Sequence, residues 1–184
     1  MDLVDGPFYA KVHKGFYEAL ADVWQPLQYE VARLDPQRTK RLWITGHSLG
    51  GALAALAAAK WTQNQRHVNG LYTFGQPRTG DAKFRRNFNF AMKATSFRFV
   101  NDNDLVTRVP PRALGFSHVG TLKYFTDAGR LEGDVTWWQM FLDRWTFHAD
   151  GFFDGALEAA QDHSMTGYRT WIESDRDLED ARHA

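Results

Sequence analysis

Residues 42–56 constrain the fold of this chain more than any other segment. They read LWITGHSLGGALAAL, which predicts a buried strand, a tight turn and an alanine-rich helix. Ser48 lies in the turn with Gly46 and Gly50 two residues to either side, and residues without side chains tolerate the strained backbone of such a turn. The first N–H groups of the helix point to the same place and favour negative charge there. We therefore interpret Ser48 as a nucleophile held above the edge of a sheet.

Strand-like and helix-like segments alternate along the chain. Strands are indicated where β-branched and aromatic residues cluster between turn-forming residues, at residues 42–45, 71–74, 96–100 and 116–125, the last broken by Gly120. Helices are indicated where apolar residues recur at helical spacing, at residues 17–32, about 49–63, and from Asp81, a suitable N-cap, through Phe84 and Phe88. This order predicts an α/β fold with a mostly parallel sheet and helices on both faces.

Length and composition predict one globular domain over residues 1–184. The chain is 43% hydrophobic and 24% charged, which is ordinary for such a domain. Its 22 basic and 22 acidic residues balance, so charge gives no reason to expect nucleic acid as a partner. The charged end, from about residue 173 to residue 184, is expected to be a solvated or frayed tail.

The chain contains no cysteine. This excludes a disulfide, a thiolate zinc site and a cysteine nucleophile. It fits a reducing compartment such as the cytoplasm but also permits export. We recognise no signal peptide and no apolar run long enough to cross a bilayer, which slightly favours a cytoplasmic location.

A serine nucleophile requires a base and an acid that orients the base. In folds with this strand–turn–helix arrangement they follow in the order Ser, Asp or Glu, His. Asp102 and Asp104 both lie in a loop after the strand at residues 96–100, and their position alone does not choose between them. His163 is the histidine best placed at an element boundary. It stands before a helical stripe of apolar residues, which are Met165, Tyr168, Trp171 and Ile172.

The other histidines favour structural roles. His13, His47 and His118 lie beside expected strands, where a hydrogen bond to the backbone is the commoner role of a histidine. His148 has two aspartates nearby, but the spacing matches no metal-ligand pattern. No metal or organic cofactor is implied.

Five short blocks of the sequence are distinctive when taken together. They are VHKGF at residues 12–16, GHSLGG at 46–51, FGQPRTGD at 74–81, the segment 101–104 followed by Pro110 and Pro111, and DHSM at 162–165. In this order they resemble the class 3 lipase family, the fungal-type triacylglycerol lipases and their bacterial relatives. The resemblance implies a partial, N-terminally short α/β-hydrolase fold that cleaves carboxylic esters of lipids.

The resemblance also implies roles for individual residues. Ser48 becomes the nucleophile and His163 the base, and the backbone N–H of Leu49 becomes one oxyanion donor. Asp104 becomes the acid, because Asn101 and Val106 stand around it as in the family pattern. An acylglycerol or similar lipid ester is the implied substrate.

The family pattern includes a segment that we do not find upstream of residue 12. In the family a buried strand ends there in an Arg-Gly-Thr/Ser type of turn, which supplies a second oxyanion donor, and a mobile helical lid follows. Residues 2–10 do not resemble that turn. We therefore expect a weakened oxyanion hole and an unpaired sheet edge that favours self-association. The alternative function is a catalytically silent lipase-like module, structural or completed by another chain.

Aromatic residues crowd the segment before the DHSM block. Trp137, Trp138, Phe141 and Trp145 are spaced largely as on one face of a helix. The plain interpretation is a helix that covers the core. The functional interpretation is a substrate-binding wall for acyl chains or a surface that contacts the lipid–water interface.

Overall fold

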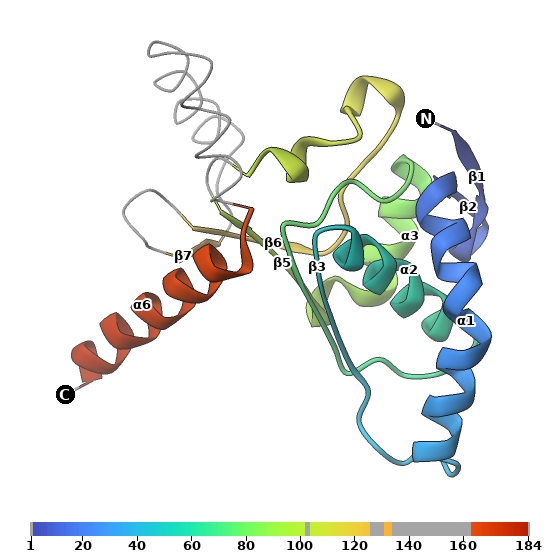
Figure 1. The fold of residues 1–184 in the computed structure, drawn as a ribbon, viewed down its shortest axis with the longest axis horizontal. Coiled ribbons are helices and arrows are strands. Elements are labelled where there is room, and N and C mark those ends of the chain that lie inside the picture. Colours follow the sequence, from blue (N-terminus) through green and yellow to red (C-terminus); the bar gives the residue numbers. More distant parts are fainter. Residues whose placement is uncertain (1, 102–103, 126–130, 134–162, 184) are drawn as a thin grey trace.

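A five-stranded sheet forms the centre of the computed structural model, which describes residues 2–101, 104–125, 131–133 and 163–183 (Figure 1). Its strands stand in chain order: β3 (Trp43–His47), β4 (Gly70–Phe74), β5 (Ser96–Asn101), β6 (Thr121–Phe125) and β7 (Leu131–Gly133). The first four run parallel, and β7 is antiparallel to β6. The mostly parallel sheet predicted from the sequence is confirmed, and β3 lies at one edge of it among the described strands.

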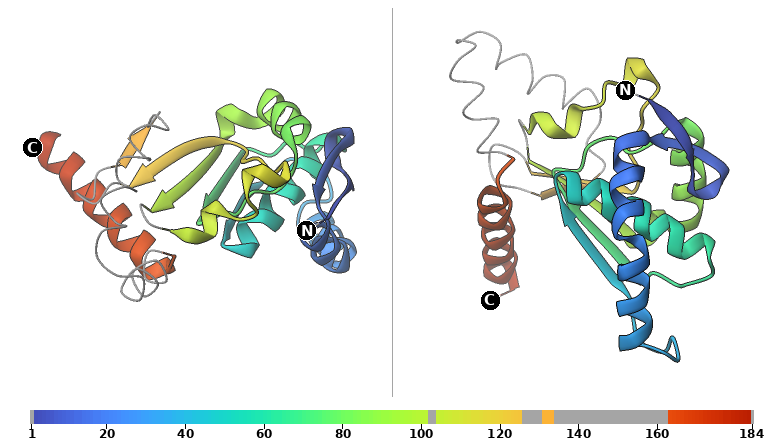
Figure 2. Two further views of the ribbon diagram at one scale, coloured as in Figure 1. Left: turned by 90° about the horizontal axis from the view of Figure 1, so that it is seen from above. Right: turned by 45° about the vertical axis from the view of Figure 1, so that its right-hand side comes forward.

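Helices lie on both faces of this sheet, as predicted (Figure 2). They are α1 (Lys14–Leu34), α2 (Leu49–Gln63), α3 (Ala82–Met92) and α6 (Met165–His183), with short 3₁₀ turns η1 (Pro7–Tyr9), η2 (Lys93–Thr95), η3 (Leu105–Arg108) and η4 (Arg112–Leu114). The α2 helix packs on β3 and β4, α1 packs on α2, and α6 stands on the opposite side of the sheet. Among the described helices, none has the length and apolar character needed to cross a bilayer.

Small side chains let α2 lie close to the sheet. Ala52, Ala55, Ala58 and Ala59 are completely buried. Each adds little volume between helix and strands, so the backbones approach and bury the surrounding apolar surface. This close approach fixes the first turn of α2 at the carboxyl end of β3.

Aromatic rings line the face of the sheet that α2 does not cover. Phe74 stacks on Phe99 with centroids 5.0 Å apart, and Tyr72 lies 5.4 Å from Phe97. Tyr168 of α6 meets the edge of this ladder, with its ring 5.8 Å from that of Phe74. A helix remote in sequence is thereby packed beside the carboxyl ends of β4 and β5.

Polar caps explain where two of the helices begin. The Asp81 carboxylate accepts a hydrogen bond from the Phe84 N–H at 2.6 Å, which confirms the predicted N-cap of α3. His13 accepts one from the Phe16 N–H at 3.3 Å and caps α1.

Three segments differ from the sequence-based expectation. Only residues 121–125 of the expected strand 116–125 are a named strand, because Gly120 has a left-handed φ of +78° that turns the chain just before them. The expected frayed tail from residue 173 continues α6 to residue 183. The Arg169–Glu173 pair, 2.8 Å apart and one turn along the helix, supports it.

The third difference lies at the amino-terminal end. Residues 3–13 form an unpredicted hairpin of β1 (Leu3–Gly6) and β2 (Ala10–His13), separate from the main sheet. In its turn Phe8 and Tyr9 have positive φ. A positive φ is usually indicated by glycine, and neither residue is one, so the sequence does not reveal this turn.

Candidate active site

Ser48 occupies the strained turn that the sequence predicts between a strand and a helix. Its φ of 55° and ψ of −129° lie outside the regular regions for a residue with a side chain. The Ser48 N–H donates to the Phe74 carbonyl at 2.9 Å, which ties the turn to the neighbouring strand β4. The conformation leaves the serine hydroxyl at the start of α2, where the helix N–H groups favour negative charge.

The structure brings Ser48, His163 and Asp104 into one hydrogen-bonded chain. His163 Nε2 lies 2.7 Å from Ser48 Oγ. His163 Nδ1 lies 3.0 Å from each carboxylate oxygen of Asp104. The side chain of Asp104 is fully buried, whereas that of His163 is 20% exposed. A hydroxyl, an imidazole and a buried carboxylate in this order can transfer the hydroxyl proton to the imidazole while the carboxylate holds the ring.

Two further donors hold the Asp104 carboxylate. The Val106 N–H donates to Oδ1 at 2.9 Å, and the Tyr168 hydroxyl donates to Oδ2 at 2.6 Å. The Tyr168 hydroxyl in turn accepts from the Asn101 N–H at 3.0 Å. Sequence reasoning placed Tyr168 only in an apolar stripe of a helix, since nothing in the local pattern joins it to a loop 64 residues earlier.

His47 lies beside the candidate base. Its Nε2 lies 2.6 Å from the His163 carbonyl oxygen, and since a carbonyl only accepts, Nε2 carries the hydrogen. The two imidazole rings are 4.7 Å apart between centroids. A hydrogen bond to the backbone is the role expected for His47 from the sequence.

The remaining predicted site residues fall into two groups. Leu49 is the first residue of α2, and an N–H in the first turn of a helix has no carbonyl partner within the helix. It therefore stands where an oxyanion donor is expected. Asp102 lies outside the described residues, as do the four candidate substrate-binding aromatics Trp137, Trp138, Phe141 and Trp145.

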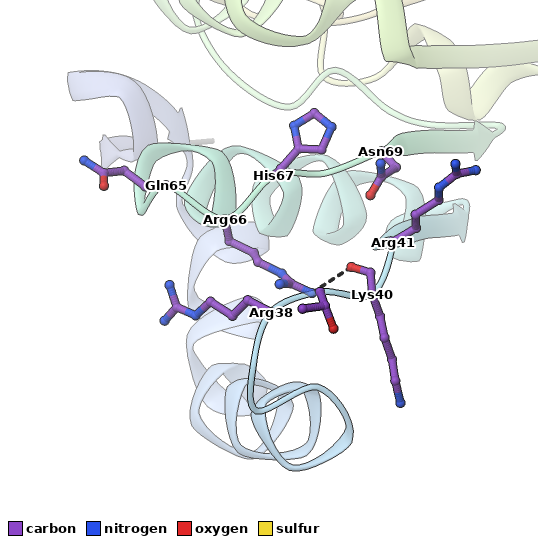
Figure 3. Close-up of a pocket in the computed structure, with 8 residues that line it drawn as sticks. Arg38, Lys40, Arg41, Gln65, Arg66, His67 and Asn69 are labelled. Carbon is purple, nitrogen blue, oxygen red and sulfur yellow. Dashed lines mark hydrogen bonds between the residues drawn. The ribbon is translucent and has the colours of Figure 1, made fainter.

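A basic hollow lies beside the residues that precede β3, at the end of that strand away from Ser48. Figure 3 shows its lining residues. Its volume is about 270 Å³, and Arg38, Lys40, Arg41 and Arg66 are among its lining residues. Arg66 is neutralised by Asp35 at 2.5 Å and also donates to the Lys40 carbonyl at 3.3 Å. The other cationic side chains point in different directions, so they do not converge on one ligand (Figure 3). The hollow is separate from the Ser48 site.

Comparison with known proteins identifies the family. The profile of the family described as lipase (class 3) matches residues 3–114. The chain belongs to the class 3 lipase family. Its matched region includes Ser48 and Asp104, while His163 lies beyond it.

Individual members of the class 3 lipase family are similar over part of their length. A lipase of Rhizomucor miehei is 38% identical over 64% of this chain and 33% of its own. Secreted mono- and diacylglycerol lipase 1 of Fusarium solani is 37% identical over 73% of this chain and 39% of its own. The chain therefore spans little more than a third of these relatives. The word secreted in the second name does not support the cytoplasmic location expected from the absence of cysteine, of a recognisable signal peptide and of a membrane-spanning run.

A solved structure gives the same result for the fold. It is a triacylglycerol lipase described as having a serine protease triad as its catalytic centre. It superposes with a TM-score of 0.61 at 35% identity, over 68% of this chain and 50% of that one. The expected α/β-hydrolase fold is thereby confirmed for the part of the chain that matches.

Proposed function

We propose that this chain carries the catalytic site of a serine hydrolase that cleaves carboxylic esters of lipids. Ser48 is the nucleophile, His163 the general base and Asp104 the acid that orients it. The observation that carries the proposal is the continuous hydrogen-bonded chain from Ser48 Oγ through both nitrogens of His163 to Asp104. Membership of the class 3 lipase family supports lipid esters as the substrate class.

The reaction takes place in two stages. Ser48 Oγ attacks the ester carbonyl while His163 Nε2 takes its proton, and the tetrahedral oxyanion forms beside the N–H of Leu49. His163 then gives that proton to the departing alcohol, which leaves an acyl-enzyme on Ser48. In the second stage a water gives a proton to His163, attacks the acyl carbon and releases the fatty acid as Ser48 regains its proton.

Asp104 acts on His163 in both stages. Its carboxylate accepts from Nδ1–H, which places the lone pair of Nε2 toward Ser48 Oγ. The charged carboxylate also stabilises the imidazolium that forms while Nε2 holds the proton. Its complete burial protects this interaction from water.

A fluorophosphonate probe tests the nucleophile. It should label Ser48 stoichiometrically, as located by mass spectrometry, and hydrolysis of a short p-nitrophenyl ester should stop in Ser48→Ala. Ser117 lies outside the hydrogen-bonded chain, so Ser117→Ala is the matched control. It should keep both the labelling of Ser48 and the hydrolysis of the ester. Equal labelling of Ser48→Ala would refute the assignment of the nucleophile.

The alternative function is a silent module of lipase ancestry. It predicts a folded chain that neither reacts with the probe nor hydrolyses any ester. A specific feature that favours it is the sole assigned oxyanion donor, Leu49, because loss of one donor typically costs a hundred- to a thousandfold in turnover, to order of magnitude. Turnover of a soluble ester, measured with the Ser48→Ala control, separates a weak hydrolase from a silent one.

We also propose that the chain associates with a second copy through β3. This strand lies at the sheet edge among the described strands, and Trp43 on it is 55% exposed. An uncovered edge strand with an apolar residue favours pairing with another chain. Sedimentation should give more than the monomer mass, and Trp43→Lys should lower it, whereas a monomer at all concentrations contradicts the proposal.

A further inference from the structure

We propose that Tyr168 is a positioning residue for the acid of the triad. In this role its hydroxyl holds the Asp104 carboxylate aligned with His163 and shares the negative charge of that carboxylate while His163 carries the proton. The inference rests on the function proposed above. It assigns Tyr168 no contact with substrate.

The direction of each hydrogen bond around Tyr168 follows from the chemistry of its partners. The Asn101 N–H can only donate, so at 3.0 Å it uses an acceptor position of the Tyr168 oxygen. The single hydroxyl hydrogen is then free to point to Asp104 Oδ2, 2.6 Å away. A backbone group of β5 thereby orients the hydroxyl toward the acid.

Burial keeps this donor protonated. Tyr168 is completely buried, and burial, followed by the nearby charge of Asp104 and the hydrogen bond to it, raises the pKa of the phenol above its usual value. Arg98 of β5 acts in the opposite direction and does not offset these causes. The phenol is therefore neutral wherever a triad functions, and it donates rather than repels.

The two oxygens of Asp104 share three donors. Oδ1 accepts from Val106 and Oδ2 from Tyr168, and His163 Nδ1 lies 3.0 Å from both. Without the Tyr168 hydroxyl, the imidazole is the one donor of the three that is left to Oδ2. The negative charge of the carboxylate then acts more strongly on that ring. A stronger negative charge beside the ring favours its protonated form, the imidazolium. A base that holds its proton more tightly in the free enzyme accepts a proton from Ser48 only at higher pH.

The test compares three variants of the whole chain with the wild type on one soluble ester. Tyr168→Phe removes the hydroxyl and keeps the ring. Tyr72→Phe, on the same aromatic face of the sheet, is the matched control. A third form, Tyr168→3-fluorotyrosine, supplies a more acidic phenol and thus a stronger donor at the same position. Turnover is normalised to active sites titrated with the fluorophosphonate probe, so an unfolded fraction does not count.

We expect Tyr168→Phe to lower kcat about tenfold with little change in KM, since a hydrogen bond to a charged group is lost. The acidic limb of its kcat/KM profile should move to higher pH, and that of Tyr168→3-fluorotyrosine to lower pH. His47 of β3 faces the same imidazole, so each profile is repeated in His47→Gln to show that the moving limb belongs to His163. Tyr72→Phe should leave the profile unmoved.

Different results separate the inference from the function on which it rests. Activity that persists in Ser48→Ala refutes the proposed function. If activity depends on Ser48 but the acidic limb is the same in all three variants as in the wild type, the role of Tyr168 is overturned and the proposed function stands. If Tyr168→Phe does not fold, the fluorinated form decides by itself, because a purely structural tyrosine gives no shift of the limb.

Discussion

Gly75 lies directly against the carboxylate of Asp104. A Cβ atom at Gly75 would come 2.7 Å from Asp104 Oδ2 and 2.9 Å from His163 Nδ1, both far inside van der Waals contact. Its φ of +59° also lies in the left-handed region that disfavours a side chain. The residue that follows β4 therefore leaves the space in which the Asp104 carboxylate and the His163 imidazole meet.

We predict that Gly75→Ala separates the acid from the base. Turnover should fall by about a hundredfold or more, since misplacing a catalytic group by about 1 Å can cost that much. Gly115→Ala is the matched control, because Gly115 also has a positive φ, +86°, but a Cβ there meets nothing within 4 Å. It should show a small loss of stability and normal turnover per folded molecule. Equal losses in the two variants would mean that backbone strain, not the space beside Asp104, is responsible.

The two glycines around Ser48 should respond differently to the same change. A Cβ at Gly46 would overlap the Gly50 carbonyl, whereas a Cβ at Gly50 meets nothing within 4 Å. Gly46→Ala should thus abolish labelling of Ser48 or prevent folding. Gly50→Ala should fold normally and gain about 0.5–1 kcal/mol of stability, because alanine is the better helix residue. Thermal unfolding measures the stability of both variants, and the fluorophosphonate probe measures labelling of Ser48. Normal labelling of Gly46→Ala would contradict the inference that the turn has no room for a side chain at this position.

Replacing the acid should stop turnover without unfolding the chain. Asp104→Asn keeps the shape, but its amide N–H can hold the imidazole in the wrong tautomer, so we expect a loss of about ten-thousandfold in kcat. The control is Asp102→Asn, for which we expect a mild effect. Measured kcat values for the two variants check the choice, and a larger loss in Asp102→Asn would transfer the role to that residue.

The Asp35–Arg66 pair should make stability depend on acid pH. Burial acts to raise the pKa of Asp35, but hydrogen bonds from Arg66, Lys40 and Thr39 outweigh it and hold the pKa below its usual value. The contribution to stability is then complete above the unfolded-state pKa of about 3.9 and is lost as pH falls through the lower folded value. In Asp35→Asn, stability should be lower at neutral pH and should change less between about pH 4 and pH 2. The exposed acid Asp22, changed to Asn, is the control. Urea unfolding at a series of pH values measures this, and parallel curves for wild type and Asp35→Asn would contradict it.

Local patterns predicted the centre of the fold correctly. The strand before Ser48, the alanine-rich helix after it and the cap at Asp81 each depend on residues within one or two turns of each other. Their bounds shifted by at most two residues, and α1 begins three residues earlier than expected, at Lys14, because His13 caps it. The predicted order of Ser48, Asp104 and His163 needed the family pattern as well, because Asp102 is equally suited by position.

Long-range contacts were not accessible from the sequence. Tyr168 reads as an apolar helix position, and only the folded sheet brings its hydroxyl to Asp104. Gly75 reads as the end of a strand, and nothing local reveals that a carboxylate and an imidazole lie against it. The hairpin at residues 3–13 was missed because its turn uses Phe8 and Tyr9 at positive φ instead of the expected glycine or asparagine.

The members of the proposed triad are made at different times during synthesis, because they lie far apart along the chain. Ser48 and His163 are 115 residues apart, and α6 follows directly after the base. A ribosome that has reached residue 100 has already made the turn that holds Ser48, the strand β3 and the helix α2. It has not provided a base. Because domains are made from the amino end at roughly 5–20 residues per second, several seconds separate the synthesis of the serine from that of its histidine partner.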